Sequence, residues 1–253
     1  MIVFPNTKIN IGLFVLEKRS DGFHNIESIF YPVMNLFDVL EIVKSENIEF
    51  SSTGIAVPGD VDSNLCLRAF HLLQQDFSIS NVKIHLHKNI PVGAGLGGGS
   101  SNAAFMLKAL NELFEIHISP KQLVAYARKL GSDCAFFIEN KPVFAFNKGD
   151  EYENVAVDLF PYDIKIEYPK IHISTAEAYG GVKPTTNRID LKKLVNEPIL
   201  NWKAAIKNDF EESIFPKHPE IEKLKEKMYS NGAIFASMTG SGSAVFGIFN
   251  KTL

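Results

Sequence analysis

One stretch of the chain, Pro91-Val92-Gly93-Ala94-Gly95-Leu96-Gly97-Gly98-Gly99-Ser100-Ser101-Asn102, holds five of its 17 glycines. It follows an alternating run at 82–87 that is typical of a strand, and an apolar repeat typical of a helix comes after it. Glycine adopts backbone conformations closed to other residues and lets another group approach the main chain closely. A glycine-rich loop that opens a helix can aim several backbone N–H groups at one point, where the helix dipole adds partial positive charge. The stretch therefore predicts a phosphate-binding loop.

Three common phosphate-binding loops fit this sequence poorly. A Walker loop is excluded, because Gly99 is followed by Ser100-Ser101 and not by lysine. The dinucleotide fingerprint is met formally, but the acidic residues about 20 positions on, Glu112 and Glu115, fall inside the predicted helix. The catalytic-loop and Asp-Phe-Gly signatures of protein kinases are missing. Five glycines in seven positions also disfavour a plain turn in a β-rich fold, which leaves a glycine-serine loop that caps a helix.

Size and composition limit the class of protein. The 253 residues suffice for one large or two modest domains, with 45% apolar and 22% charged residues and a net charge of −3. This balance gives no general attraction to nucleic acid or to an anionic membrane. Cys66 and Cys134 lack the spacing of metal ligands, and no apolar run reaches about 18 residues. We expect a reduced, cytoplasmic protein without nucleic-acid or membrane partners.

Alternation and turn signals predict two α+β domains, 1–150 and 151–253, divided at the turn Asn147–Asp150. In a strand over 2–16, Ile9 and Ile11 fall on a buried face, and Lys8 and Asn10 fall on a polar one. Helix signals occur at Asn64 or Ser63 as a cap, at Ser100, Ser101 or Asn102 as a second cap, and at Ser119-Pro120 with Gly131 as a stop. Further strands are expected at 29–33, 38–50, 82–87, 164–168, 233–237 and 244–249, and helices at 65–77, 120–130, 202–214 and 219–229, besides one with a core face of Met106, Leu110 and Leu113.

The glycine-serine loop resembles that of the GHMP kinases, which use it in place of a Walker loop. The segments Asn6–Leu13 and Arg19–His24 are similar to the entry motif of one branch, which phosphorylates 4-diphosphocytidyl-2-C-methyl-D-erythritol in the non-mevalonate isoprenoid pathway. Leu130–Cys134 and Met238–Phe246 follow in family order, so the resemblance spans nearly the whole chain. It implies an ATP-dependent small-molecule kinase with an N-terminal domain like ribosomal protein S5 domain 2 and a ferredoxin-like C-terminal domain.

The resemblance also implies where ATP binds. Asn64 would hydrogen bond the adenine edge, although a plain helix cap explains this residue equally well. Ser100 or Ser101 could approach Mg²⁺ or phosphate oxygens, but no carboxylate completes a metal site, so the metal ligands stay unassigned. The remaining ATP-binding residues are those of the loop: Pro91, Val92, Gly93, Ala94, Gly95, Leu96, Gly97, Gly98, Gly99, Ser100 and Ser101.

Two residues are candidates for catalysis. Asp133 follows a helix-ending glycine and could simply cap the apolar run after it; by resemblance it matches the catalytic aspartate. Phosphoryl transfer to an alcohol needs a group that accepts the hydroxyl proton and orients the oxygen toward the γ-phosphate. Lys8 by itself indicates a solvated strand lysine; by resemblance it pairs with the aspartate, keeps it ionised and helps to stabilise developing charge.

The resemblance places the cytidine end of the substrate at Phe23 and His24. The family commonly has tyrosine where this chain has Phe23, which keeps the stacking face and loses the hydroxyl. Tyr179 would supply an opposing ring. The other residues expected at the substrate are Asn10, Gly240 and Gly242, of which the two glycines belong to a second glycine turn that supports the phosphate loop.

Two alternatives stay open beside this interpretation. A GHMP kinase for another alcohol, such as mevalonate, homoserine or a sugar, is disfavoured by the element Asp21–His24. A nucleotide-binding regulator without catalysis is disfavoured because Lys8 and Asp133 are both present. The sequence assigns no oligomeric state. Similar enzymes usually continue beyond the final strand, so the C-terminal domain is expected to be short there.

Overall fold

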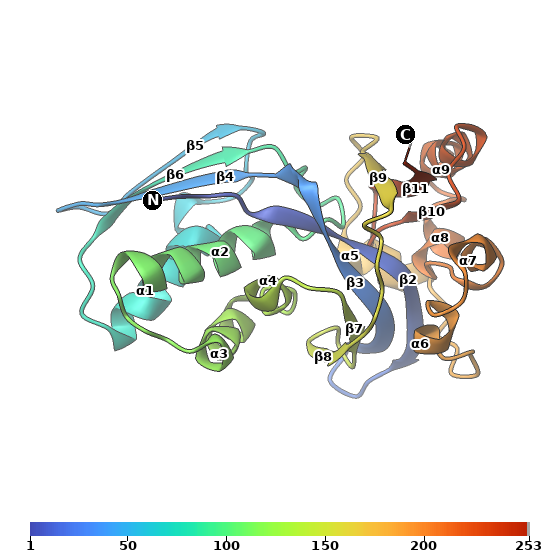
Figure 1. The fold of residues 1–253 in the computed structure, drawn as a ribbon, viewed down its shortest axis with the longest axis horizontal. Coiled ribbons are helices and arrows are strands. Elements are labelled where there is room, and N and C mark those ends of the chain that lie inside the picture. Colours follow the sequence, from blue (N-terminus) through green and yellow to red (C-terminus); the bar gives the residue numbers. More distant parts are fainter. Residues whose placement is uncertain (252–253) are drawn as a thin grey trace. The chain divides into compact units, whose positions relative to one another are not determined.

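A computed structural model describes residues 1–251, and two compact units divide the chain (Figure 1). Strands β2 (Asn6–Lys18) and β3 (His24–Phe37) contribute to both units. With 13 and 14 residues they extend about 43–46 Å at the usual rise per residue, long enough to serve two cores. The first unit comprises Met1–Lys8, Pro32–Val92 and Gly97–Lys141, and the second comprises Ile9–Tyr31, Gly93–Leu96 and the chain from Pro142 onward.

The units are interleaved along the chain, whereas the sequence analysis placed one boundary near residue 150. The difference arises from the two long strands, whose residues 9–31 belong to the second unit. As limits of domains, 1–150 and 151–253 stay a prediction. The expected shortening at the C-terminus concerns positions outside the described range. Within that range, no helix is long and apolar enough to cross a membrane.

The first unit is a four-stranded sheet with helices on one face (Figure 1). Its strand order is β1-β4-β6-β5, in which β5 runs parallel to β6 and the other pairs are antiparallel. Inward residues such as Leu40, Ile84 and Leu86 are buried, as are Phe70 and Leu110 of the helices. Its elements are β1 (Ile2–Val3), β4 (Val39–Lys44), β5 (Glu49–Gly54), β6 (Val82–Lys88), η1 (Val61–Ser63), α1 (Leu65–Asp76), α2 (Gly98–Leu113), α3 (Pro120–Leu130) and α4 (Phe136–Glu139).

The second unit contains a three-stranded antiparallel sheet, β10-β11-β9, and strands β7 and β8, which extend the sheet begun by β2 and β3. Its core contains Phe210, Ile221 and Met238 from helices and a strand, and Ile173 from the loop before α5. Its elements, besides β2 and β3, are β7 (Val143–Phe146), β8 (Glu151–Asn154), β9 (Tyr162–Glu167), β10 (Phe235–Met238), β11 (Val245–Asn250), α5 (Thr175–Gly181), α6 (Leu191–Leu194), α7 (Ile199–Ala205), α8 (Phe210–Ile214) and α9 (Pro219–Ser230).

The prediction that β2 buries only one face is wrong. Lys8 and Asn10, on the face expected to be polar, are 3% and 1% exposed. Each unit covers part of that face. In the first unit, Gly97 lies against the Lys8 stem, and in the second the Thr239 hydroxyl contacts Asn10. Alternation therefore identified the strand correctly, but tertiary packing decided its exposure.

The predicted helix over 202–214 is also wrong, because two helices, α7 and α8, replace it. Between them the backbone forms a bridge in which Leu13 N donates to Lys207 O and Asp209 N donates to Leu13 O. The Asn208 amide donates to Met238 O at 2.9 Å and Gly240 O at 2.8 Å. The apolar spacing of the segment is real, but this polar anchor makes it leave the helical conformation.

Candidate active site

The two predicted catalytic residues lie together in the first unit. Lys8 comes from β2, and Asp133 lies in the turn after α3. Lys8 Nζ is 3.5 Å from Asp133 Oδ2, and the two side chains are 4% and 30% exposed. Burial lowers the pKa of Lys8, an effect that the Asp133 charge and hydrogen bond oppose. The arrangement provides an accessible carboxylate with a buried cation beside it, which suits proton transfer from an alcohol and stabilisation of negative charge.

The start of α2 lies next to this pair. Gly97 has φ +70°, and a Cβ on it would lie 3.1 Å from the Phe137 ring and 3.2 Å from Lys8 Cγ. A side chain is therefore excluded both by backbone conformation and by space. Gly97 is the N-cap of α2 without a side-chain cap, so the prediction that Ser100, Ser101 or Asn102 caps this helix is wrong. The backbone N–H groups of its first turn are thus available to an anion.

The two loop serines and Asn64 differ in their contacts. Ser101 Oγ is buried and has no hydrogen-bond partner among the described residues. Ser100 hydrogen bonds the buried thiol of Cys134. Asn64 Oδ1 accepts from Cys66 N at 2.9 Å and caps α1. The helix-cap interpretation of Asn64 is confirmed, and its contact with adenine stays a prediction.

The first half of the loop, Gly93–Leu96, packs on the second glycine turn inside the second unit. A Cβ on Gly95 would lie 2.0 Å from Thr239 O, and one on Gly240 would lie 3.0 Å from Gly95 Cα. The Thr239 hydroxyl donates to Gly95 O at 3.3 Å, and Ala244 N donates to Ala94 O at 3.2 Å. The turn therefore supports the loop directly, in the way expected for Gly240.

The other loop residues have distinct surroundings. Ala94 and Leu96 are each 1% exposed, so both residues anchor the loop in the interior. Gly93 is open except toward His172, whose Nδ1 would lie 2.7 Å from a Cβ placed there. Gly242 has φ +90° and packs against Met238 Sδ. Pro91 and Val92 are half-buried, and Gly99 is exposed on α2.

Asn10 is an internal anchor in the second unit. Its backbone N–H donates to Thr239 Oγ1 at 3.0 Å, and its side chain donates to Ser28 Oγ at 2.8 Å. Ser28 Oγ in turn donates to Gly12 O at 2.6 Å. These contacts show a structural role, and a contact between Asn10 and substrate stays a prediction. The sequence analysis included Thr239 only as part of the segment Met238–Phe246 and missed Ser28, because nothing in the local pattern distinguishes Ser28.

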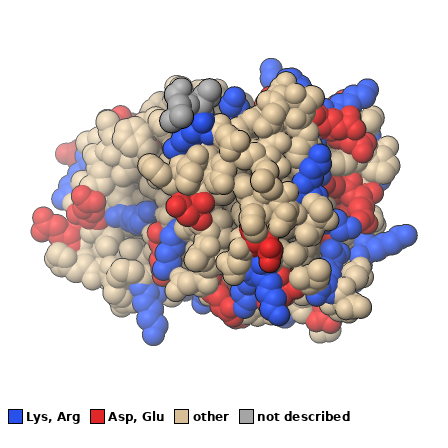
Figure 2. Space-filling view, turned by 45° about the vertical axis from the view of Figure 1, so that its right-hand side comes forward, with Lys and Arg blue, Asp and Glu red and all other residues tan. Residues whose placement is uncertain are grey.

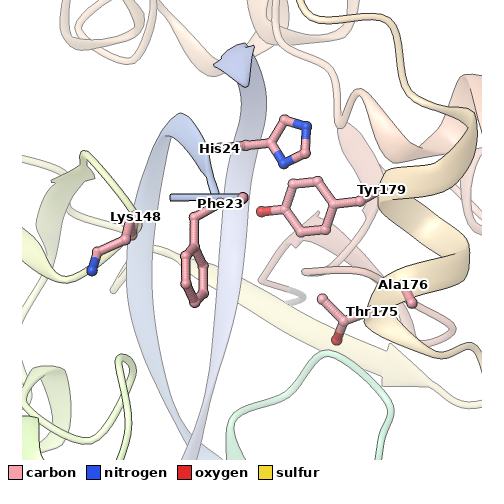
Figure 3. A pocket seen from close by; sticks show the side chains of 7 residues that line it. Phe23, His24, Lys148, Thr175, Ala176 and Tyr179 are labelled. Atoms are coloured by element: carbon pink, nitrogen blue, oxygen red, sulfur yellow. The ribbon is translucent and has the colours of Figure 1, made fainter. Parts of the chain in front are cut away.

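A pocket of about 240 Å³ lies within the second unit (Figure 3). Tyr179 and two neighbours from α5 form one side, and Phe23 lies across from them. The His24 and Tyr179 rings are stacked, with centroids 4.6 Å apart and planes at 20°. Burial and the nearby Lys18 lower the pKa of His24, so its ring is neutral at pH 7 and offers one donor and one acceptor. The pocket is lined by Gly22, Phe23, His24, Lys148, Thr175, Ala176 and Tyr179.

The structure thus brings Tyr179 into one pocket with Phe23 and His24, the residues that the sequence analysis placed at the cytidine end of the substrate. It adds Lys148, whose Nζ lies 5.2 Å from the centroid of the Phe23 ring. Phe23 is 60% exposed, unusual for so large an apolar side chain. The signal for Lys148 was its place in the turn 147–150, which had been interpreted only as a domain boundary.

Charges elsewhere are mixed. Figure 2 shows acidic and basic side chains interspersed among the described residues of the face that it displays. This distribution matches the small net charge of −3. Phosphate groups of a ligand would therefore be held by local geometry and by individual cations.

Comparison with known proteins identifies the family of this chain. Residues 64–141 match the GHMP kinases N terminal domain, and residues 190–253 match the GHMP kinases C terminal domain. A Cytophaga hutchinsonii protein named 4-diphosphocytidyl-2-C-methyl-D-erythritol kinase is 51% identical over 99% of this chain and 93% of its own length. A Bacteroides fragilis protein of the same name is 46% identical over 99% and 92%, respectively.

Solved structures agree with the sequence relatives. The crystal structure of 4-(cytidine 5'-diphospho)-2C-methyl-D-erythritol kinase has a TM-score of 0.85 and 30% identity, covering 98% of this chain and 90% of that one. A homoserine kinase from Cytophaga hutchinsonii, at 18% identity and a TM-score of 0.69 over 98% and 85%, shares the fold. The predicted α+β, two-domain GHMP kinase fold is confirmed. With both family domains matched and near-complete coverage by close relatives, the chain belongs to the GHMP kinase family.

Proposed function

We propose that this chain is an ATP-dependent kinase that phosphorylates the 2-hydroxyl of 4-diphosphocytidyl-2-C-methyl-D-erythritol in isoprenoid-precursor biosynthesis. Relatives that are 46–51% identical over almost the whole chain carry the name of that kinase. The observation in the molecule that carries the proposal is the Lys8–Asp133 pair beside the start of α2. A cytoplasmic location stays a prediction from composition.

Asp133 acts as the general base in this mechanism. Its carboxylate accepts the proton of the acceptor hydroxyl while that oxygen bonds to the γ-phosphorus, and the bond from the γ-phosphorus to the β-phosphate oxygen breaks to release ADP. Lys8 places a positive charge 3.5 Å from the carboxylate and stabilises the negative charge that develops nearby. The backbone N–H groups at the start of α2 bind phosphate oxygens, and Asn64 contacts the adenine edge.

The residues fit a Mg²⁺ ion that is carried mainly by the ATP phosphates. Among residues 1–251, no group of three or more His, Cys, Asp or Glu side chains is arranged to hold a metal. The Ser101 hydroxyl at the start of α2 has no hydrogen-bond partner within this range but is fully buried, so such an ion would be held by phosphate oxygens and water, in keeping with the few protein ligands that Mg²⁺ takes. When bound, Mg²⁺ supplies charge neutralisation on the phosphates.

The pocket of the second unit binds the cytidine end of the acceptor. The exposed ring of Phe23 stacks on the base, and neutral His24 hydrogen bonds to it. The ring of Phe23 provides this stacking without the hydroxyl of the tyrosine that is common in the family. The acceptor is therefore recognised at a part of the molecule that does not react. Binding energy from such a part can be used to hold the reacting hydroxyl in position and so raise the rate.

A coupled assay of ADP release tests this function across a panel of alcohols. The expected result is that the cytidylyl methylerythritol substrate gives the highest kcat/KM, while mevalonate, homoserine and sugars give at least about 100-fold less. Higher kcat/KM for another alcohol would support the alternative acceptor. ATP binding without transfer to any alcohol would support the non-catalytic regulator.

The matched variant is Asp133→Asn, which removes the base and keeps the size of the side chain. We expect kcat to fall by about 10²–10⁴, the usual contribution of a general base, and the urea midpoint to fall as well, because buried Lys8 loses its counter-charge. A folded variant that turns over at the wild-type rate would remove Asp133 from the mechanism.

A further inference from the structure

A second buried ion pair lies in the first unit, apart from Lys8 and Asp133. Asp38, between β3 and β4, is 0% exposed, and Lys88 at the end of β6 is 3% exposed. Lys88 Nζ donates to Asp38 Oδ2. Taking two charges out of water costs about as much as their attraction returns, so such a pair adds little stability over apolar residues. What it can provide is a single fixed geometry for the segments that it joins.

One oxygen of Asp38 holds the strand side of the glycine loop. Asp38 Oδ1 accepts from Asn89 N at 2.7 Å and from Ile90 N at 2.8 Å. These are the last two residues before Pro91, where the loop begins. Asn89 Nδ2 also donates to Phe37 O at 3.1 Å, which adds a contact to the residue before Asp38. The backbone therefore enters the loop from a fixed point.

The other oxygen holds the helix side of the same loop. Asp38 Oδ2 accepts from Asn102 Nδ2 at 2.8 Å, and Asn102 lies in the second turn of α2. Lys88 Nζ, on the same oxygen, lies 2.8 Å from the position that a Cβ on Gly98 would take. Gly98 is the first residue of α2, so the buried ammonium packs against the start of this helix.

We propose that Asp38 is a positioning residue that fixes both ends of the glycine loop, so that the amides at the start of α2 are in place before ATP binds. The four donors reach the two carboxylate oxygens from two segments, residues 88–90 before the loop and Asn102 after its start, and charge-assisted hydrogen bonds of this kind restrict orientation strongly. A preorganised loop binds with a smaller loss of conformational entropy. The inference rests on the proposed function only in that ATP is the ligand of the loop.

The first test is Asp38→Asn, which keeps the shape and replaces one acceptor with a donor. The dissociation constant of a non-hydrolysable ATP analogue, measured by calorimetry, is expected to rise 10- to 100-fold. The dissociation constant of the cytidylyl substrate is expected to change less than 2-fold, because its proposed pocket belongs to the other unit. Wild-type affinity for the analogue in folded Asp38→Asn would overturn the proposal.

A double variant separates positioning from stability. Asp38→Leu with Lys88→Met replaces the ion pair by apolar side chains of similar volume, which commonly preserves the fold. Because Asn89 N, Ile90 N and Asn102 Nδ2 lose their acceptor, we expect its urea midpoint to fall, and we expect its affinity for the ATP analogue to be at least 10-fold weaker than that of a variant destabilised equally at another site. Recovery of both stability and affinity would assign the pair a purely structural role and overturn the proposal.

Two further variants test the proposal even if Asp38→Asn does not fold. Asn102→Ala removes only the contact to the helix side, and we expect 3- to 10-fold weaker binding of the analogue. Leu73→Ala creates a cavity in buried α1 far in sequence from the loop, and we expect lower stability with unchanged affinity. Equal loss of affinity in Leu73→Ala and Asn102→Ala at matched stability would contradict positioning. If the wild-type protein bound ATP but did not phosphorylate the cytidylyl substrate, the proposed function would be contradicted and the positioning role of Asp38 would not.

Discussion

At the scale of single residues, burial lowers the pKa values of two lysines, Lys8 and Lys108. Lys8 is 3% exposed, and loss of hydration lowers its pKa below 10.5 even though Asp133 lies beside it. Lys108 on α2 is affected by the same cause, which lowers its pKa to about 8. Both residues therefore release their protons at a lower pH than a solvated lysine would.

The position of Lys8 predicts an alkaline limb in the pH profile of activity. The charge that stabilises the reaction is present below the pKa of folded Lys8 and is lost as the pH rises through it. We expect kcat/KM for phosphoryl transfer from ATP to fall with a midpoint below pH 10.5. We expect the protein to remain folded over the same pH range. Rate measurements together with circular dichroism at each pH check this, and a flat profile up to pH 10.5 would contradict it.

Lys108 predicts a pH dependence of stability. Its Nζ donates to Phe137 O at 3.0 Å and lies 3.8 Å from the Phe105 ring centroid, yet desolvation sets its pKa. Between about pH 8 and 10.5 the unfolded chain binds more protons than the folded one, so the free energy of unfolding rises with pH. Between about pH 8 and 10.5, the free energy of unfolding of the wild type should rise by at most about 3 kcal/mol relative to that of Lys108→Met. Urea titrations of both proteins at pH 7.5 and 10 measure this difference, and a constant gap between them argues against it.

At the scale of elements, glycines decide how closely the loop and the second glycine turn approach. Gly95→Ala would combine φ +78° with a Cβ 2.0 Å from Thr239 O, so the turn and the loop must separate. We expect a loss of more than about 3 kcal/mol in the free energy of unfolding, since a left-handed alanine alone costs about 1–2 kcal/mol.

Gly232→Ala is the matched control for this prediction. Gly232 has φ +93° with nothing within 4 Å of an added Cβ, so only the backbone cost of about 1–2 kcal/mol applies. Urea denaturation of the two variants measures the difference that close packing makes. Equal losses in both would show that the contact with Thr239 does not matter.

The elements also show how far sequence reasoning extends. Helix α3 was predicted to the residue from Ser119 as its cap, Pro120 in its first turn and Gly131 after its end, and the structure adds a capping box between Ser119 and Gln122. These signals act within one turn of chain and need no partner. The start of α2 and the break between α7 and α8 were missed, because Gly97 and Asn208 take their conformations from residues distant in sequence.

At the scale of the whole molecule, the two units carry separate natural probes. Cys66 and Cys134 are buried free thiols in the first unit, and burial raises their pKa values to about 12 and about 11. The single tryptophan, Trp202, is 3% exposed in the second unit. Thiol labelling therefore reports on the first unit, and fluorescence reports on the second.

We expect the two probes to give the same urea midpoint. Strands β2 and β3 pass from one unit into the other without interruption, so melting either unit breaks strands of the other. A disulfide reagent should find no reactive thiol in the native chain and two after unfolding. Two midpoints that differ by more than the error of the fits would show that the units unfold independently.

The candidate site was predictable from the sequence only in part. Lys8 and Asp133 are 125 positions apart, and the family order of motifs, not local chemistry, connected them. The structure places Lys8 Nζ 3.5 Å from Asp133 Oδ2. The contacts of Asp38 with Lys88 and Asn102 join strands and a helix across 50 and 64 positions, and no periodicity or spacing announces such contacts.

Tyr179 gives the pocket a stiff wall, which matters for inhibitor design. One face of its ring stacks on His24, and Phe210 meets it edge-on at 4.8 Å and 79°. Phe210 is 2% exposed in the core of the second unit, so a compound that pushes this ring aside must also disturb the interior. Phe23, on the opposite side, is largely exposed and free of such packing. Scaffolds that keep the Tyr179 side fixed and vary their substituents toward Phe23 and Lys148 would meet the adaptable half of the pocket.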